Sequence, residues 1–184
     1  FNGIPNIKVY SPSYYCDLNN AFVNALYHKE GACVIRYPRG TEFYKPDEYT
    51  CNGDDYQVFG DSDAEIAIVT YGRIFGECYK AYEMLKADSK KVKIIKLNLI
   101  VPIPEGSLEH LKGVKKVFFF EEGVESGGVG ESFASAMLEN KLSPEFILTA
   151  FPDCFVKQGK TDSILKQYGL DCDGIYNAVI KEIL

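Results

Sequence analysis

Residues 117–137, VFFFEEGVESGGVGESFASAM, contain the three parts of a strand–loop–helix unit. An apolar run from Val117 to Phe120 ends at two carboxylates, Glu121 and Glu122, and a glycine-rich loop follows. Small and apolar residues then recur at helical spacing to the end of the stretch. A buried strand that leads through a tight loop into a helix is the repeating unit of parallel α/β sheets. This stretch therefore predicts an α/β fold.

Two interpretations fit the glycine loop, which contains Gly123, Gly127, Gly128 and Gly130. Such a loop at a helix start can hold a phosphate through its backbone N–H groups. The spacing matches neither G-x-G-x-x-G nor G-x-x-x-x-G-K-[ST], and the four nearby glutamates would repel a diphosphate. The other interpretation, which we favour, is that the glycines let a strand and a helix, or two subunits, pack closely.

Strand and helix patterns alternate along the rest of the chain. The predicted strands cover residues 7–11, 32–38, 64–72, 92–101, 115–122 and 145–151. The predicted helices cover residues 16–29, 74–87, 105–112, 129–140, 161–168 and 172–183. This order indicates an α/β protein with a mostly parallel sheet and helices on both faces.

The pattern also divides the chain into three parts. Residues 1–45 form a β-α-β piece, which is too small to bury both of its faces alone. Residues 46–60 lie in a polar stretch and form a predicted linker, with a possible short strand at Tyr56 to Phe59. Residues 61–184 carry the regular alternation and form the predicted C-terminal domain.

Composition narrows the class of protein. The chain has 184 residues, 46% hydrophobic and 25% charged, as in soluble globular proteins. The net charge of −6 argues against nucleic-acid and anionic-membrane partners. No apolar run approaches the ~20 residues of a membrane helix, and no signal peptide is visible. We expect a cytoplasmic protein, and the strand-like opening without Met suggests a fragment of a longer polypeptide.

The sequence indicates no metal centre and no catalytic residue. Its six cysteines form no C-x-x-C pair and only two histidines could join them, so a zinc site is not supported. Cys33 and Cys78 lie in apolar patterns and are expected to be small buried residues in a reducing cytoplasm. The motifs G-x-S-x-G and H-E-x-x-H are absent, and no Cys/His dyad stands out.

One candidate binding site lies at residues 36–40, RYPRG, where the second predicted strand ends. Guanidinium groups bind phosphate and carboxylate through two N–H donors, and ligands bind at the carboxyl ends of strands in open α/β sheets. Arg39 is therefore a candidate phosphate or carboxylate ligand. Arg36 has an alternative role, because it could pair with a nearby carboxylate.

Several segments together resemble a known family. These are IPNIKVYSPS (4–13), IRYPRG (35–40), VTYG (69–72), FFFEEGVESGGVG (118–130), FPDCFVKQG (151–159) and TDSILKQYGLDCDGI (161–175). The chain as a whole resembles the C-terminal third of the 1-deoxy-D-xylulose-5-phosphate synthases, thiamine-diphosphate enzymes of the transketolase superfamily. YPRG and the GG-x-G loop are shared across relatives, whereas FPDCFVKQG and YGLDCDGI favour the synthases over transketolase proper.

The resemblance implies a transketolase C-terminal-domain-like fold at residues 61–184 and the end of a pyrimidine-binding domain at residues 1–45. It implies that Arg39 contacts the phosphate of glyceraldehyde 3-phosphate. The parent enzyme would be a homodimer with thiamine diphosphate and magnesium, which condenses pyruvate with that aldehyde to supply isoprenoid biosynthesis. The family's G-D-G motif, catalytic histidines and activating glutamate are not in this sequence. The segment alone is therefore expected to bind no cofactor, to be inactive, and to serve acceptor-phosphate binding and dimer scaffolding.

The chain departs from the family at two places. Tyr14 and Tyr15 stand where an acidic residue is usual, and Val101 to Glu105 replaces the usual K-P-L-D. These departures leave open a transketolase relative, or a relative of the 2-oxo-acid dehydrogenase β subunits. An alternative from another class is a non-catalytic assembly module.

Overall fold

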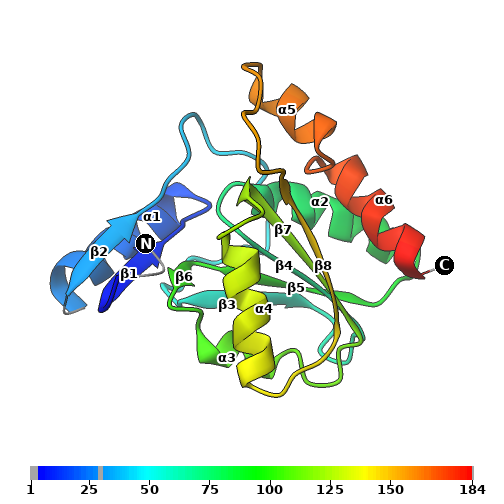
Figure 1. The fold of residues 1–184 in the computed structure, drawn as a ribbon, viewed down its shortest axis with the longest axis horizontal. Coiled ribbons are helices and arrows are strands. Elements are labelled where there is room, and N and C mark those ends of the chain that lie inside the picture. The colour runs from blue at the N-terminus through cyan, green and yellow to red at the C-terminus, as the bar shows by residue number, and fades with distance from the viewer. Residues whose placement is uncertain (1–3, 29–30, 184) are drawn as a thin grey trace.

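The structure is a computed structural model that describes residues 4–28 and 31–183. Figure 1 shows two sheets joined by one chain. In chain order the elements are β1 (Ile7–Tyr10), α1 (Tyr15–Val23), the π-helix η1 (Asn24–His28), β2 (Ala32–Ile35), β3 (Tyr56–Gly60), β4 (Ile66–Tyr71), α2 (Ile74–Ala87), β5 (Val92–Leu97), β6 (Leu99–Val101), α3 (Glu105–Glu109), β7 (Lys116–Val124), α4 (Val129–Glu139), β8 (Glu145–Phe151), α5 (Thr161–Gln167) and α6 (Cys172–Ile183).

The larger sheet has five strands in the order β3-β5-β4-β7-β8. Strands β5, β4, β7 and β8 run parallel to their neighbours. Strand β3 lies at one edge and pairs with β5 in the antiparallel direction. The prediction of a mostly parallel sheet is therefore confirmed, and the possible strand near Tyr56 is β3.

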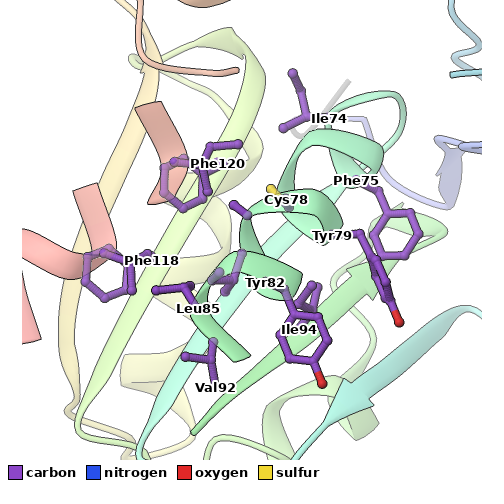
Figure 2. Packing of buried hydrophobic residues seen from close by; sticks show 14 of the residues in the cluster. Ile74, Phe75, Cys78, Tyr79, Tyr82, Leu85, Val92, Ile94, Phe118 and Phe120 are labelled. Carbon is purple, nitrogen blue, oxygen red and sulfur yellow. The ribbon is translucent and has the colours of Figure 1, made fainter. Parts of the chain in front are cut away.

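Alternate side chains of each central strand face opposite layers of helices. In β7, Phe118 and Phe120 pack with residues of α2 and α6, as Figure 2 shows in part. Val117 and Phe119 face the other way and pack with residues of α3 and α4. All four side chains are fully buried. Helices thus cover both faces of the sheet, as the alternating sequence pattern predicted.

The smaller sheet has the order β2-β1-β6, and it combines residues from both predicted domains. Strand β1 pairs with β2 in parallel and with β6 in the antiparallel direction. The prediction of one strand over residues 92–101 was wrong, because the strand is interrupted at Asn98, between β5 and β6. The backbone N–H groups of Asn98 and Leu99 both donate to the carbonyl of Asp55, which turns the chain from one sheet to the other.

The first helix differs from the sequence expectation in how its apolar residues lie. The predicted end at residue 29 falls outside the described residues, and the structure has α1 followed by η1. Phe22 and Leu26, two apolar residues four positions apart that form part of a helical stripe, stand in solvent, with exposed fractions of 46% and 71%. A helical stripe is normally buried against a sheet or a second helix. The layer that would cover this stripe is not supplied by the described part of the chain.

The segment between β2 and β3 packs against α2. The Tyr44 hydroxyl donates to the Glu83 carboxylate at 2.8 Å and the Lys80 ammonium lies 4.3 Å from the centre of the Phe43 ring. The Tyr79 hydroxyl also donates a hydrogen bond into this segment. Aromatic side chains thus hold residues 43–48 against α2, across the predicted boundary between the N-terminal piece and the linker.

The cysteines differ in part from the expectation. Cys78 is fully buried, as predicted, and Cys33 is half-buried. A disulfide joins Cys16 of α1 to Cys51 in the segment before β3, a pairing that the sequence pattern did not indicate. None of the helices in residues 4–28 and 31–183 is long and apolar enough to cross a bilayer.

Candidate functional site

A cleft of about 220 Å³ opens where several strands end. Strands β1, β2 and β4 all end beside it, because its lining begins one residue after each of them, at Ser11, Arg36 and Gly72. Arg39, Arg73 and residues near the end of β7 and the start of α5 complete the lining. Carboxyl ends of parallel strands are where ligands bind in open α/β sheets.

Arg36 lines one side of this cleft, and two contacts hold its side chain in place. Its Nη2 donates to the backbone carbonyl of Glu122 at 2.6 Å, and its guanidinium lies 5.6 Å from the centre of the Tyr71 ring. The alternative considered from the sequence was an ion pair with a carboxylate. The structure instead supplies a carbonyl and an aromatic face, and both hold the guanidinium in one place.

Arg39 is exposed and lines the same cleft. Its side chain makes no hydrogen bond or ion pair with any residue in the described ranges. The adjacent Gly40 has a φ of +121°, a conformation that L side chains rarely adopt. The guanidinium of Arg39 in the YPRG turn therefore has no polar partner in the described ranges. Its role as a phosphate ligand stays a prediction.

Sequence reasoning missed two further residues of the cleft. Arg73 stands at the start of α2, and its side chain is 19% exposed. Ser11 follows β1 and is 1% exposed, yet its Oγ has no hydrogen-bond partner among the described residues. Both positions come from segments far from YPRG in the chain. Only an expectation that β1, β2 and β4 end side by side could have found them.

Glu121, in the C-terminal half of β7, is a buried carboxylate that holds the glycine loop. It accepts hydrogen bonds from the Tyr71 hydroxyl at 2.7 Å and from the backbone N–H groups of Val129 and Gly130, each at 3.1 Å. Burial raises the pKa of Glu121, although these three donors oppose the shift. The same burial raises the pKa of Tyr71, helped by the Glu121 charge.

The glycines of the loop allow close packing. A Cβ on Gly128 would lie 2.4 Å from the Val124 carbonyl oxygen, and one on Gly130 would lie 2.5 Å from Leu148. The N–H groups at the start of α4 that could bind a phosphate are occupied by Glu121. The geometry supports the packing interpretation over the phosphate cradle.

A buried ion pair ties the two sheets together. Lys96 of β5 is fully buried, and its Nζ lies 2.9 Å from Oδ2 of Asp17 in α1 and 2.6 Å from the Tyr49 hydroxyl. Asn98 also accepts from this ammonium. Burial lowers the pKa of Lys96 to about 8, although the Asp17 carboxylate opposes the shift. This cluster joins α1 to β5 and does not line the arginine cleft.

The departures from the family pattern have structural roles. Tyr14 is buried, donates its hydroxyl to the Tyr44 carbonyl at 2.7 Å and packs edge-on against Tyr49. Tyr15 is exposed and its backbone N–H donates to the Glu42 carboxylate. A small cavity beside the cleft is lined partly by these rings and shares Arg73 with it. The Val101 to Glu105 segment begins with a cis Val101–Pro102 bond at the end of β6.

The described residues do not fit a magnesium site. Their one cluster of possible metal ligands is Cys16, Asp17 and Cys51. Magnesium requires oxygen ligands, whereas this cluster offers two sulfurs, already joined as a disulfide. Its single carboxylate is bound by Lys96. No residue in the described ranges is therefore assigned to magnesium or to a diphosphate.

Comparison with known proteins gives consistent matches. The family described as "Transketolase, C-terminal domain" matches residues 58–175. The chain is 27% identical over 98% of its length to a 1-deoxy-D-xylulose-5-phosphate synthase of Blochmanniella pennsylvanica, and 28% identical over 96% to one of Phocaeicola vulgatus. It spans only 29% of the length of each of these relatives.

Two further matches are to shorter proteins. The chain is 27% identical to a "Putative transketolase C-terminal section" of Methanocaldococcus jannaschii, over 98% of this chain and 57% of that protein. A solved structure described as a split-gene transketolase, an inactive beta4 tetramer, has the same fold. Its TM-score is 0.81 with 23% identity, over 98% of this chain and 59% of that one. The chain therefore belongs to the transketolase C-terminal domain family and corresponds to the C-terminal portion of a transketolase-superfamily protein.

Proposed function

We propose that this chain acts as the C-terminal part of a 1-deoxy-D-xylulose-5-phosphate synthase. That enzyme would join pyruvate to glyceraldehyde 3-phosphate with loss of carbon dioxide and so supply isoprenoid precursors. The observation that carries the proposal is the arginine cleft at the ends of β2 and β4, in which Arg39 is uncommitted. Similarity to synthases over nearly the whole chain supports it.

In this proposal Arg39 binds the phosphate of the acceptor. An exposed guanidinium can offer two parallel N–H donors to two phosphate oxygens, a geometry that lysine cannot reproduce. The hydrogen bond from Arg36 to the Glu122 carbonyl holds the neighbouring side of the cleft in place. The bound phosphate would therefore meet a preformed surface. This chain would thus orient the acceptor, while residues elsewhere in the enzyme carry out the bond-forming chemistry.

The cofactors belong to the rest of the enzyme in this proposal. Thiamine diphosphate with magnesium would supply an electron sink to that enzyme. This chain alone is expected to bind neither group and to be inactive. Incubation of the chain with pyruvate, glyceraldehyde 3-phosphate, thiamine diphosphate and magnesium tests this expectation. Turnover above a no-protein control would contradict it.

The N-terminal part is where the rest of the enzyme would dock. Phe22, Val23, Leu26 and Tyr27 of α1 and η1 are exposed large apolar side chains. Residues 1–45 would then complete a pyrimidine-binding domain together with another part of the enzyme. Residues 46–60 would link this domain to the C-terminal domain. Residues 61–184 would form that C-terminal domain and scaffold a homodimer. The partners are protein and small molecules, with no nucleic acid or membrane, and the proposed location is cytoplasmic.

A transketolase relative is the second candidate. The archaeal relative named as a putative transketolase C-terminal section favours it, as do the unusual residues at Tyr14 and at Val101 to Glu105. The two enzymes differ in the donor, because the synthase uses pyruvate and transketolase uses a ketose phosphate. Assays of the assembled enzyme with each donor would separate them.

The decisive variant is Arg39→Ala in the assembled enzyme. Loss of a charge-assisted contact should cost about 1.5–3 kcal/mol, a roughly 10- to 150-fold loss in kcat/KM for the phosphorylated acceptor. The KM for pyruvate should stay nearly unchanged. Lys86→Ala, at the far end of α2, is the matched control for loss of an exposed cation. An equal loss with an unphosphorylated acceptor would show that Arg39 does not recognise phosphate.

A further inference from the structure

We infer that Arg73 and Ser11 form the second half of the anion site that Arg39 begins, and that Asp162 of α5 competes with the anion for Arg73. This inference rests on the proposed function, because it extends the acceptor-phosphate site to residues that the family resemblance does not assign. Its occupant is the phosphate monoester of the acceptor.

The charge of the cleft is the first support. Three guanidinium groups, those of Arg36, Arg39 and Arg73, line it, whereas Glu122 is the one acidic residue in the lining. The Glu122 backbone carbonyl already accepts from Arg36. A phosphate monoester carries close to two negative charges at neutral pH, so the guanidinium groups of Arg39 and Arg73 together match it better than one of them alone.

Ser11 is the second, independent support. A buried hydroxyl without a partner is uncommon, because desolvating it without a compensating hydrogen bond costs free energy. Ser11 is 1% exposed and lines the cleft, and its Oγ has no partner in the described ranges. A Cβ on Gly72 would lie 2.8 Å from this oxygen, so a side chain at position 72 would crowd the Ser11 hydroxyl. A phosphate oxygen in the cleft would give the hydroxyl its missing acceptor.

Arg73 is held at the edge of the cleft by a weak partner. Its Nη2 lies 3.1 Å from Oδ1 of Asp162, whose side chain is 87% exposed. Exposed ion pairs contribute little stability, so a bound dianion can displace this carboxylate from Arg73. Asp162 is therefore a competitor that occupies Arg73 when the cleft holds no anion.

The test is an NMR titration of the chain with glycerol 3-phosphate as the probe and glycerol as the unphosphorylated control. Arg73→Gln should weaken binding about tenfold, the size of one charge-assisted contact. Ser11→Ala should weaken it about threefold. Asp162→Asn should tighten it about two- to fivefold, and this gain should vanish when Arg73→Gln is also present. Lys86→Gln, at the other end of α2, is the matched control and should leave binding unchanged.

The variants also separate this inference from the proposed function. If Arg39→Gln weakens binding while Arg73→Gln and Ser11→Ala do not, the acceptor site stands and the inference is overturned. If Arg73→Gln weakens binding while Arg39→Gln does not, the cleft binds phosphate without Arg39, and both the role of Arg39 and the site that Arg73 would share with it are overturned. Absence of any phosphate-dependent binding to the wild-type chain would overturn both.

Discussion

Replacing Lys96 with methionine should remove the strongest polar link between the two sheets. Lys96 and Asp17 are 0% and 4% exposed, so the carboxylate left behind would stay buried without a counter-charge. Breaking a buried ion pair by removing one partner costs about 3–5 kcal/mol. Asp17 would still accept from the backbone N–H groups of Ser13 and Tyr14 and from the Tyr49 hydroxyl, so we expect the lower end, about 3 kcal/mol.

The same strand provides a matched control. Lys93 of β5 is also buried, but its Nζ donates only to the backbone carbonyls of Ser62 and His110. Lys93→Met should therefore cost about 1.5–2 kcal/mol, the lower part of the range for hydrogen bonds that involve a charged group, because its acceptors are neutral and no carboxylate loses its partner. Urea denaturation followed by circular dichroism gives both free energies. Amide hydrogen exchange of β1 and β2 shows whether Lys96→Met loosens the small sheet in particular.

The reasoning fails if Lys96→Met costs no more than Lys93→Met. It also fails if the amides of Ile7–Tyr10 keep their protection in the Lys96 variant. A double variant with Asp17→Asn adds a further check, since removal of both charges should recover part of the loss. Additive costs would show that the two side chains do not act as a pair.

Three further predictions concern the pH dependence of the Lys96 contribution, the disulfide and Glu121. Because burial lowers the folded-state pKa of Lys96 to about 8, below its ordinary value near 10.5, the unfolded chain binds more protons between these values. The stability advantage of the wild type over Lys96→Met should therefore grow as the pH rises from 8 to 10.5, and a constant gap in urea titrations would contradict this. Cys51→Ser should lower stability by about 4 kcal/mol, since the disulfide closes a loop with a sequence separation of 35, and a reducing agent should then have no further effect on the variant. Glu121→Ala should cost about 3 kcal/mol by leaving three donors unpaired, two of them buried, whereas Glu122→Ala, at a half-buried position, should cost under 1 kcal/mol in thermal unfolding.

The large sheet was predictable because its signals are local. The helix predicted over residues 74–87 is α2, with the same bounds, since an apolar stripe at helical spacing is uninterrupted there. The split of β5 from β6 was not predictable from apolar periodicity, because the run over residues 92–101 continues on both sides of Asn98. The turn depends on the Asp55 carbonyl, which lies about forty residues earlier in the chain.

The candidate site was predictable only in part for a similar reason. Arg36 and Arg39 lie three positions apart in one recognisable motif. Arg73 and Ser11 reach the same cleft from other strand ends, and no spacing rule connects them with YPRG. The exposed residues of α1 illustrate a different limit, since a helical stripe does not reveal whether its covering layer belongs to the same piece of chain.

The insertion of β6 into the small sheet makes the two parts of this protein hard to separate by cutting the chain. A protease nick after Asp47 would leave β1 and β2 on one fragment, while β6, Lys96 and Cys51 would remain on the other. The fragments would still share a sheet, a buried ion pair and a disulfide. They would run as one band on a non-reducing gel and stay together in native chromatography even after reduction.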